Sequence, residues 1–463
     1  MRAVVLTVVA ALLLSMPYLS SAQARTAAGS AIHTYRLRAT VLGTPHGITI
    51  SGDGFGSAIA PVPGRRDEYY GLSDRGPNVD GPVSNAKVFP VVDYHPAIGR
   101  FRLRNGRAEM LESITLRDAS GAPLSGLVPP LGAGNTGETA FDGFARPIAA
   151  RTDGVDPEGL VALADGTFWV SEEYAPSLIH FAANGRLIER VTPFGPNALG
   201  HVLPAEFAYR IPNRGFESLA VTPDGRTLVV LTQSALANGI SVSDAKSSAV
   251  LRLLTYAPAT GETHQYIYLL EDPGVLSTMT SDMTAVTDRK FVVVEQDIKF
   301  PGAGSRLKGI FEIDLDGATD LLSSRRPEAM KGGAVQEATL EKLTRGQTTE
   351  EARATLAGLG IQPVAKRLWL DLNAVLLAVD SSGRVFAHDK VEGIAIADGG
   401  RRVVLANDSD FGISSTNPPS ARIAPKIVPS TGSPDYGEFI VIDVDRLTLA
   451  GLGPSAASHA GNQ

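Results

Sequence analysis

One short pattern recurs along this sequence and constrains its fold more than any other feature. In each copy a polar residue is followed by a short apolar run, a turn six or seven residues later and a second apolar run. Four copies begin with an acid, at Glu158, Glu217, Asp282 and Glu392, and a fifth begins with His46. An Asp-Gly pair between two apolar runs predicts a β-hairpin, because the turn needs a positive φ that glycine adopts without steric cost.

The spacing of the copies predicts how the hairpins are arranged. The 59 residues from 158 to 217 and the 65 from 217 to 282 each suit one four-stranded blade. The longer intervals on either side have room for about two blades, or for one blade and an insertion. Short strands with repeated glycine turns are typical of β-propellers, whereas a β-sandwich gives no reason for the repetition. We expect an all-β fold, a single β-propeller of six or seven blades. Its C-terminal strand at 439–443 should pair with an N-terminal strand and close the ring.

Two segments depart from this pattern. Residues 327–360 predict a helical insertion, because Thr348 and Glu351 have the spacing of a capping box. Residues 413–437 are rich in proline and serine, which predicts a long loop.

The N-terminus predicts export. Arg2 precedes an uncharged apolar run at 3–14, and Ala22 and Ala24 are the small residues of a cleavage site. This run is shorter than the ~20 apolar residues that span a membrane. We therefore expect a signal peptide at 1–24, cleaved near Ala24, a periplasmic or secreted protein, and no membrane span.

Composition excludes several classes of function. The chain has 42 Lys and Arg against 49 Asp and Glu, and a mildly acidic protein without a basic stripe is not expected to bind nucleic acid. The absence of cysteine excludes disulfides, thiolate nucleophiles and cysteine-based zinc sites. With 43% hydrophobic residues, the chain can form a large core. We expect one domain over 25–452, a disordered tail over 453–463, and a monomer.

The repeated acids should lie on one rim. In a hairpin, the start of the first strand and the end of the second lie at the same edge of the sheet. The second strands are followed by oxygen-rich segments, at 171–173, 232–234, 295–297 and 407–410. If each first strand is innermost, Glu158, Glu217, Asp282 and Glu392 surround a central channel together with these segments.

Clustered carboxylates raise one another's pKa unless a cation compensates them, and oxygen ligands suit Ca²⁺. We predict Ca²⁺ ligands at Glu158, Glu217, Asp282, Glu392 and Glu173. The alternative is that these acids cap turns, accept hydrogen bonds from strand-end amides and keep loops solvated.

A catalytic hypothesis follows from the same rim. We predict that Arg75 and Lys390 bind an anionic substrate and that Glu172 orients a water molecule. The chain lacks the G-x-S-x-G nucleophile motif and the H-E-x-x-H zinc motif, so it offers no support for those two mechanisms.

Four phrases carry a resemblance to a known family. They are SDRGPN at 73–78, DGVDPEGL at 153–160, FWVSEEY at 168–174 and GFESL at 215–219. Over roughly residues 40–445 the sequence resembles the phytase-like family of exported bacterial proteins, described as having "esterase-like activity of phytase". The resemblance implies a propeller related to alkaline phytases, which use several Ca²⁺ ions and an acidic channel mouth to hydrolyse phosphomonoesters. The D-A-D-D-P-A signature of those phytases is absent.

We therefore expect hydrolysis of a small anionic ester, a phosphomonoester first, by water that a divalent cation activates. Two alternatives stay open. A leading Glu-Gly at a strand start, with Asn and Asp ligands from other blades, is similar to Ca²⁺-dependent lactonase propellers. The third possibility is a non-catalytic propeller that binds a ligand, since a propeller fold supports all three functions.

Overall fold

The computed structural model describes residues 28–38, 40–130, 132, 134–323, 334–335 and 338–454. The expected signal peptide at 1–24 lies outside the described residues, as do residues 327–333 and 336–337 of the expected insertion and nearly all of the expected tail. Among the described helices, none has the length and apolar character needed to cross a membrane.

Three separate antiparallel sheets have four strands each, and in each sheet the spatial order of the strands follows their order along the chain. The first contains β11 (Pro157–Ala162), β12 (Phe168–Glu172), β13 (Ser177–Phe181) and β14 (Leu187–Val191). The second contains β15 (Phe216–Val221), β16 (Leu228–Thr232), β17 (Val250–Ala257) and β18 (Glu262–Leu269). The third contains β19 (Met279–Ala285), β20 (Lys290–Gln296), β21 (Lys308–Asp314) and β24 (Ala365–Asp371).

A larger sheet of eight strands combines two more such units. One unit is β4 (Ala58–Pro61), β5 (Glu68–Leu72), β8 (Ala97–Arg104) and β9 (Arg107–Thr115). The other is β25 (Gly393–Ala397), β26 (Arg402–Ala406), β29 (Glu438–Asp443) and β1 (Ile32–Leu37). A short parallel pairing of β1 with β9 joins them. The antiparallel pairing of β1 with β29 runs from Ile32–Ile442 to Arg36–Glu438, which confirms the predicted closure by the C-terminal strand.

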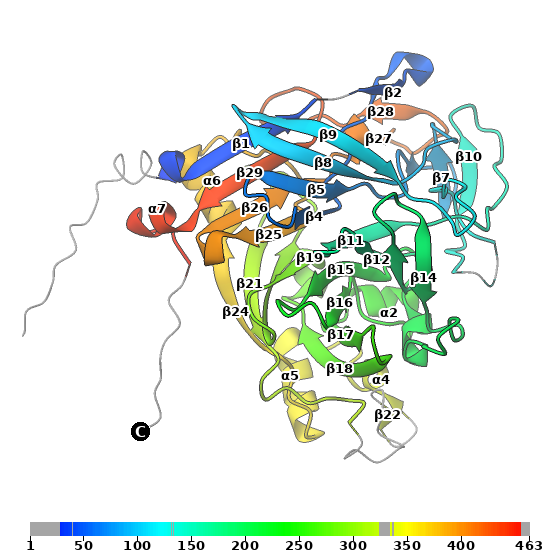
Figure 1. The fold of residues 1–463 in the computed structure, drawn as a ribbon, viewed down its shortest axis with the longest axis vertical. Coiled ribbons are helices and arrows are strands. Elements are labelled where there is room, and N and C mark those ends of the chain that lie inside the picture. The colour runs from blue at the N-terminus through cyan, green and yellow to red at the C-terminus, as the bar shows by residue number, and fades with distance from the viewer. Residues whose placement is uncertain are drawn as a thin grey trace, which may run out of the picture.

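The innermost strands of these units form a ring. Strand β4 contacts β11, and the contacts continue through β15, β19 and β25 back to β4. Figure 1 shows these strands near the centre of the view, with the remaining strands of each unit further out. This is the arrangement of a β-propeller. Six or seven blades are not confirmed, because the described strands supply five four-stranded units.

Apolar side chains fill the spaces between neighbouring units. Leu160 and Phe168 of one sheet pack with Ala58 and Ile98 of the preceding one. Trp169 packs with residues of the following sheet in the same way. Each unit therefore depends on its neighbours for burial of its hydrophobic faces.

The hairpins at 158, 217, 282 and 392 form as the sequence predicts. The prediction of a fifth such hairpin at His46 is wrong. His46 lies in a short 3-10 helix, Pro45–Gly47, between β2 (Val41–Gly43) and β3 (Ile50–Ser51). Ile50 packs in a small outer cluster with Val79 and Phe411, so this segment is not part of the ring. The corresponding innermost strand is β4.

The insertion contains helices, as predicted. It includes β22 (Ala334–Val335), β23 (Ala338–Thr339), α4 (Leu340–Leu343) and α5 (Thr349–Gly358). The capping box of Thr348 and Glu351 is present at the start of α5. Leu340 and Leu356 pack against Ile267 of β18, which attaches the insertion to the sheet of β15, β16, β17 and β18.

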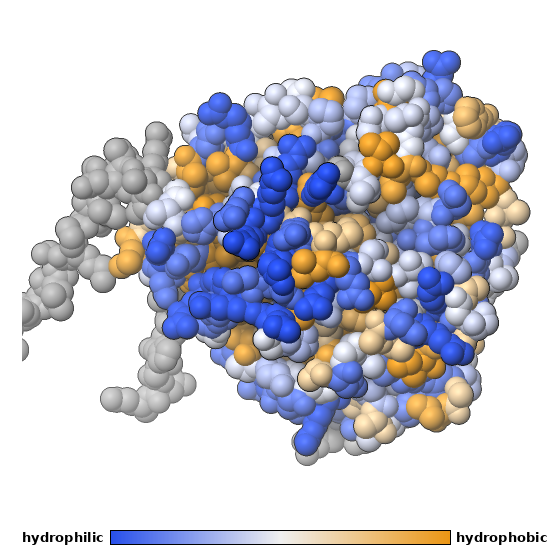
Figure 2. Space-filling view, turned by 45° about the horizontal axis from the view of Figure 1, so that its top comes forward, coloured by the Kyte–Doolittle hydropathy of each residue, from blue (hydrophilic) through white to orange (hydrophobic). Residues whose placement is uncertain are grey.

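The described part of the chain is mostly β rather than all-β, because helices also occur outside the insertion. They are α2 (Val242–Lys246), α3 (Pro273–Leu276), α6 (Leu372–Val379) and α7 (Val444–Leu449). Short strands in the connecting segments are β6 (Val79–Asp80), β7 (Ala86–Phe89), β10 (Thr139–Asp142), β27 (Ile413–Ser415) and β28 (Ile423–Pro425). On the face in Figure 2, hydrophilic side chains crowd one broad area and hydrophobic ones are scattered around it.

Candidate active site

One end of the ring opens into a cavity of about 590 Å³. The acids that line it are Asp74, Asp80, Asp156, Glu158, Glu173, Glu217, Asp389, Glu392, Asp408 and Asp410. The basic lining residues are Arg75, Lys87, Lys390 and Lys426. The structure thus brings together six of the eight residues that the sequence predicts for the site.

β-Bulges lie at two of the repeated acids that line this cavity, Glu158 and Glu217. In the pairing of β11 with β12, Pro157 faces Glu172 and Gly159 faces Ser171, so Glu158 has no partner in the register. The pairing of β15 with β16 leaves Glu217 unpaired in the same way. A bulge changes the direction of a side chain, which explains why these acids point to the channel mouth rather than into the hydrophobic space between sheets.

The glycine after Glu158 has a separate role. A Cβ atom on Gly159 would lie 2.4 Å from the Ser171 hydroxyl and 2.6 Å from the Leu219 backbone nitrogen. Only glycine permits so close an approach of β11 to β15. The repeated Glu-Gly therefore combines a side chain that faces the channel with a backbone that fits the narrow ring.

Asp156, Glu158 and Glu173 form the tightest acidic group. One carboxylate oxygen from each residue lies within 4.8 Å of those of the other two. Glu173 is only 2% exposed, and its Oε1 has no hydrogen-bond partner in the described part of the chain. An unpartnered buried carboxylate oxygen carries a large desolvation cost.

Apart from the ion pair of Asp156 Oδ2 with Arg75 Nε at 3.6 Å, these acids and the neighbouring Glu217 have little compensating positive charge. Burial, followed by the charges of Asp156, Glu217 and Glu173, raises the pKa of Glu158 well above its usual value. Burial and the Glu217 charge do the same to the pKa of Glu173. Burial raises the pKa of Glu217 to about 7. Among the described ion pairs, none involves Glu158, Glu173 or Glu217.

These residues fit a divalent cation. All offer oxygen donors, which Ca²⁺ prefers, and a cation would compensate the charges that raise their pKa values. The open Oε1 of Glu173 is the observation that favours a ligand over a purely structural role.

Arg75 lines the cavity but is fully engaged by the protein. Nη1 donates to Glu138 at 2.9 Å and to the Tyr174 hydroxyl at 3.0 Å, and Nη2 donates to Asn78 at 3.0 Å. Its backbone amide donates to Asp156 Oδ1 at 3.1 Å. This geometry favours a role in positioning Asp156 over direct capture of a substrate anion.

Glu172 does not line the cavity. Its Oε1 accepts from the amides of Asp156 and Tyr174 at 3.1 and 3.0 Å. Its Oε2 accepts from the Ala175 amide at 2.8 Å and the Ser177 hydroxyl at 3.2 Å. This buried carboxylate holds a strand end together, so the predicted role in orienting water is not supported by its position.

Asp282 is also outside the cavity. It is 2% exposed, and Oδ2 accepts from the amides of Ile394 at 3.1 Å and Ile59 at 3.5 Å. These amides belong to β25 and β4, so Asp282 links innermost strands of different units. Its location matches the alternative that the sequence left open, an acid that satisfies strand amides.

Sequence reasoning placed the segment at 73–78 on the rim, and Asp74 of this segment lines the cavity. It missed Asp156 and Lys426 as lining residues. Asp156 lies two residues before the repeated Glu158, so proximity to a predicted residue was the available signal. Lys426 follows β28 in the segment expected to be a loop, and no sequence pattern marks it.

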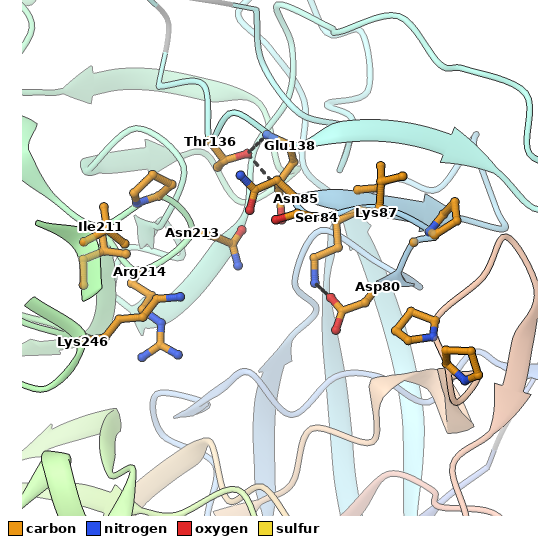
Figure 3. A pocket seen from close by; sticks show the side chains of 18 residues that line it. Asp80, Ser84, Asn85, Lys87, Thr136, Glu138, Ile211, Asn213, Arg214 and Lys246 are labelled. Atoms are coloured by element: carbon orange, nitrogen blue, oxygen red, sulfur yellow. Dashed lines mark hydrogen bonds and ion pairs between the residues drawn. The ribbon is translucent and has the colours of Figure 1, made fainter. Parts of the chain in front are cut away.

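A second pocket of about 800 Å³ adjoins the cavity and shares Asp80, Lys87 and Asn213 with it. Figure 3 shows Arg214 and Lys246 on one side of this outer pocket and the Lys87–Asp80 ion pair on the other. The outer pocket thus gives the acidic cavity a partly basic approach.

A family model described as "Phytase-like: Esterase-like activity of phytase" matches residues 53–411. The chain belongs to this phytase-like family. The match includes both the cavity's repeated acids and most of the ring, which agrees with the resemblance seen in the sequence.

Similarity to individual proteins is weaker. An uncharacterised secreted protein of Arthroderma benhamiae is 27% identical over 242 residues, which cover 42% of this phytase-like chain and 46% of that protein. The alignment therefore spans less than half the length of this relative.

Among solved structures, a Lactobacillus plantarum protein is 10% identical, with 85% of this chain and 89% of that chain covered and a TM-score of 0.32. The β-propeller domain of Myceliophteria thermophila Cps50 (Swd1) is 8% identical, with 55% and 63% covered and a TM-score of 0.24. These TM-scores are too low to support an inference about this chain.

Proposed function

We propose that this protein is an exported hydrolase that cleaves a small anionic ester, a phosphomonoester first, with the help of a divalent cation, most suitably Ca²⁺. The supporting observation is the convergence of Asp156, Glu158 and Glu173 around the unpartnered Oε1 of Glu173. The phytase-like family supports a hydrolase in general. Export is proposed from the N-terminal sequence and from the name of the secreted relative.

Asp156, Glu158 and Glu173 would hold the cation. When bound, Ca²⁺ supplies positive charge that polarises a phosphoryl or carbonyl oxygen. The backbone amide of Arg75 donates to Asp156 Oδ1 and so positions this carboxylate. Burial of Asp156 and Glu173 keeps bulk water from most of their surface and strengthens their electrostatic interactions.

Glu217 is the proposed proton acceptor for the attacking water. A general base works best when its pKa lies near the working pH. Burial raises the pKa of Glu217 to about 7 without a cation, and a bound cation would lower it towards the usual glutamate value. Gln233 Nε2 donates to Glu217 Oε2 at 2.8 Å, which orients the carboxylate and leaves Oε1 for the proton. Glu217 thereby takes the role that the sequence assigned to Glu172.

Lys390 is the proposed contact for the substrate anion, which would share its ammonium group with Asp408 and Asp410. Its side chain is 21% exposed and lines the cavity. Without positive charge, the surrounding acids would repel an anionic ester. The adjoining pocket with Arg214 and Lys246 is the proposed location of the rest of the ester.

A substrate panel tests this proposal. Phosphomonoesters, phosphodiesters, carboxylic esters and lactones are assayed with metal-free protein, with added Ca²⁺ and with chelator. We expect Ca²⁺-dependent phosphomonoester hydrolysis that is lost in Glu158→Gln. Turnover of lactones alone would identify a lactonase instead. Inactivity towards the whole panel by the folded, Ca²⁺-loaded protein would favour a ligand-binding propeller.

A further inference from the structure

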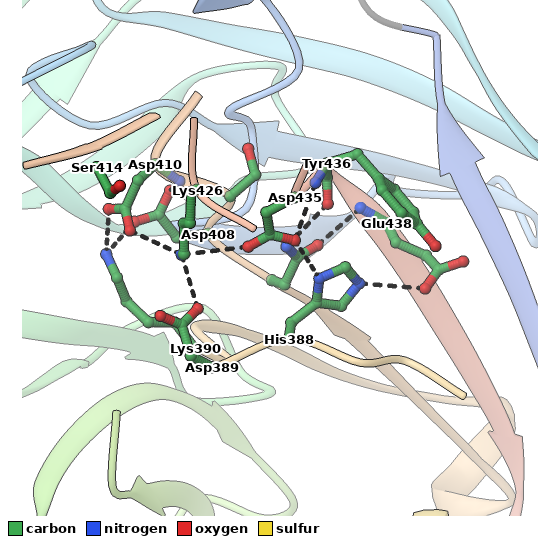
Figure 4. A network of polar contacts seen from close by, with 12 residues as sticks. His388, Asp389, Lys390, Asp408, Asp410, Ser414, Lys426, Asp435, Tyr436 and Glu438 are labelled. Carbon is green, nitrogen blue, oxygen red and sulfur yellow. Dashed lines mark hydrogen bonds and ion pairs between the residues drawn. The ribbon is translucent and has the colours of Figure 1, made fainter. Parts of the chain in front are cut away.

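Two lysines lie among the acids on one side of the cavity, where β25 and β26 meet the connecting segments (Figure 4). Lys390 precedes β25, and Lys426 follows β28. Asp408 and Asp410 follow β26. We define the lysine side of the cavity as the following seven residues: Lys390, Lys426, Asp389, Glu392, Asp408, Asp410 and Asp435.

Lys426 is surrounded by carboxylates. Its ammonium nitrogen lies 2.6 Å from Asp389 Oδ1, 2.7 Å from Asp410 Oδ2 and 3.2 Å from Asp435 Oδ2. The side chain is 7% exposed, so protein oxygens rather than water surround the charge. The contact with Asp410 Oδ2 is also a hydrogen bond, and those with Asp389 and Asp435 are ion pairs.

Lys390 has a similar environment. Its ammonium nitrogen lies 2.6 Å from Asp410 Oδ1 and 3.9 Å from Glu392 Oε1, and it also contacts Asp408. Asp410 therefore gives one oxygen to each lysine. Burial alone would raise the pKa of Asp410, but the two lysines outweigh burial and hold this pKa far below its usual value.

A buried histidine with two acidic partners packs beside the lysine side. His388 is 1% exposed, and its ring nitrogens lie 2.7 Å from Asp435 and 3.2 Å from Glu438. Burial opposes the charged ring, yet hydrogen bonds to Asp435 and Glu438 raise the pKa of His388 to about 9. Asp435 is thus held between a cationic ring and the Lys426 ammonium.

The opposite side of the cavity has less compensation, where the described ion pair is that of Asp156 Oδ2 with Arg75 Nε at 3.6 Å. Asp156, Glu158 and Glu173 converge there, and Glu173 keeps an unpartnered oxygen in the described structure. The cavity is therefore asymmetric in charge. Two lysines pair with the acids on one side, whereas on the other Asp156 pairs with Arg75 and no described ion pair involves Glu158 or Glu173.

We propose that Lys390 and Lys426 are resident cations, which occupy the lysine side in place of a second divalent ion and restrict metal binding to the Asp156–Glu158–Glu173 side. Ammonium-to-oxygen distances of 2.6 and 2.7 Å approach the 2.3–2.6 Å of Ca²⁺–oxygen contacts. A divalent ion and the two ammonium groups cannot share the same oxygens. This inference deepens the proposed function and rests on it only for the cation count of the wild-type protein.

Calcium titration calorimetry of the full chain, made metal-free beforehand, tests the inference. The variants are Lys390→Met, Lys426→Met and the double substitution. We expect the double variant to bind one more Ca²⁺ per chain than the wild-type protein, because removal of both ammonium groups leaves buried acids uncompensated. Lys390→Arg with Lys426→Arg keeps both charges and should add no site.

Controls separate this effect from general damage. Lys290→Met removes a lysine whose ammonium lies 3.4 Å from Asp314 on the surface, and it should leave the cation count unchanged. Circular dichroism checks the fold, and the single variants replace the double variant if that protein does not fold. In the methionine variants, Ca²⁺ should raise the melting temperature more than it does in the wild-type protein. In the arginine double variant, Ca²⁺ should raise the melting temperature no more than it does in the wild-type protein.

The outcomes distinguish the inference from the proposed function. A folded methionine variant that binds no more Ca²⁺ than the wild-type protein would overturn the inference and leave the proposed function standing. A wild-type protein that binds no Ca²⁺, beside a methionine variant that gains one ion, would support the resident cations and refute the proposed cation site.

Discussion

The backbone amide of Glu173 donates to the carbonyl oxygen of Asp156 at 2.9 Å. Glu173 follows β12 and Asp156 precedes β11, so this bond extends the hairpin and brings the two carboxylates to the same cavity. The neighbouring Glu172 points the other way, as alternate residues of a strand do. Adjacent glutamates therefore have different roles, one as an internal acceptor and one as an open oxygen donor.

Substitution of Glu172 should change stability rather than cation binding. In Glu172→Ala, four hydrogen-bond donors lose their acceptor. Because unsatisfied buried donors are costly, we expect the free energy of unfolding to fall by about 3 kcal/mol. Urea unfolding measures this loss, and the Ca²⁺-induced rise in melting temperature should persist. Loss of that rise in a folded Glu172→Ala protein would place Glu172 in the cation site.

Cation binding should weaken as the pH falls. Burial raises the pKa of Glu217 to about 7 and also raises the pKa values of Glu158 and Glu173. Below these pKa values the carboxyls are protonated, and a cation must displace the protons. Between about pH 8 and pH 5.5 we expect the Ca²⁺ affinity to drop by up to about tenfold per pH unit for each proton displaced.

Calorimetry in buffers of different ionisation enthalpy counts the protons released on Ca²⁺ binding. Glu217→Gln removes one titrating carboxyl, so its affinity should depend less steeply on pH than that of the wild-type protein. An affinity that is constant across this pH range would show that the acids are already ionised without the metal.

The repeated pattern predicted the hairpins of the ring but not their number. The copies at 158, 217, 282 and 392 have apolar strands that can be buried on both sides, and the innermost hairpins form there. The His46 copy has the same local pattern, yet Ile50 is buried in a cluster outside the ring. Local pattern could not separate these cases, because the difference depends on tertiary packing.

Strand register predicted part of the site. It correctly predicted that Glu158, Glu217 and Glu392 line one cavity, because all three lie at the start of an innermost strand. It could not place Asp282 or Glu172, because side-chain direction depends on bulges and on nearby amides. Lys426 comes from a distant segment, and only the folded structure brings it to the cavity.

A buried ion pair links the insertion to β17, and we predict that it stabilises this attachment. Arg252 of β17 contacts Glu341 of α4, with Nη2 and Nε 2.6 and 3.0 Å from Glu341 Oε1, and both side chains are fully buried. Arg252→Met should lower the free energy of unfolding by about 3–5 kcal/mol, because it leaves a buried charge unpaired.

The cation affinity of this variant should stay unchanged, since neither residue of the pair lines the cavity. Limited proteolysis should then cut the insertion faster than in the wild-type protein. Unchanged proteolysis together with a small stability loss, below about 1 kcal/mol, would show that the pair does not hold the insertion in place.

The most direct test of cation-assisted hydrolysis at the cavity compares the adjacent variants Glu173→Gln and Glu172→Gln. The initial rate of phosphomonoester hydrolysis is measured with Ca²⁺ and with chelator, at a temperature at which both variants are folded. We predict that the wild-type and Glu172→Gln proteins need Ca²⁺ and that Glu173→Gln is inactive with or without it. A metal-free wild-type protein that hydrolyses the ester at its full rate, or a Glu173→Gln protein that keeps the Ca²⁺-dependent rate, would contradict the account.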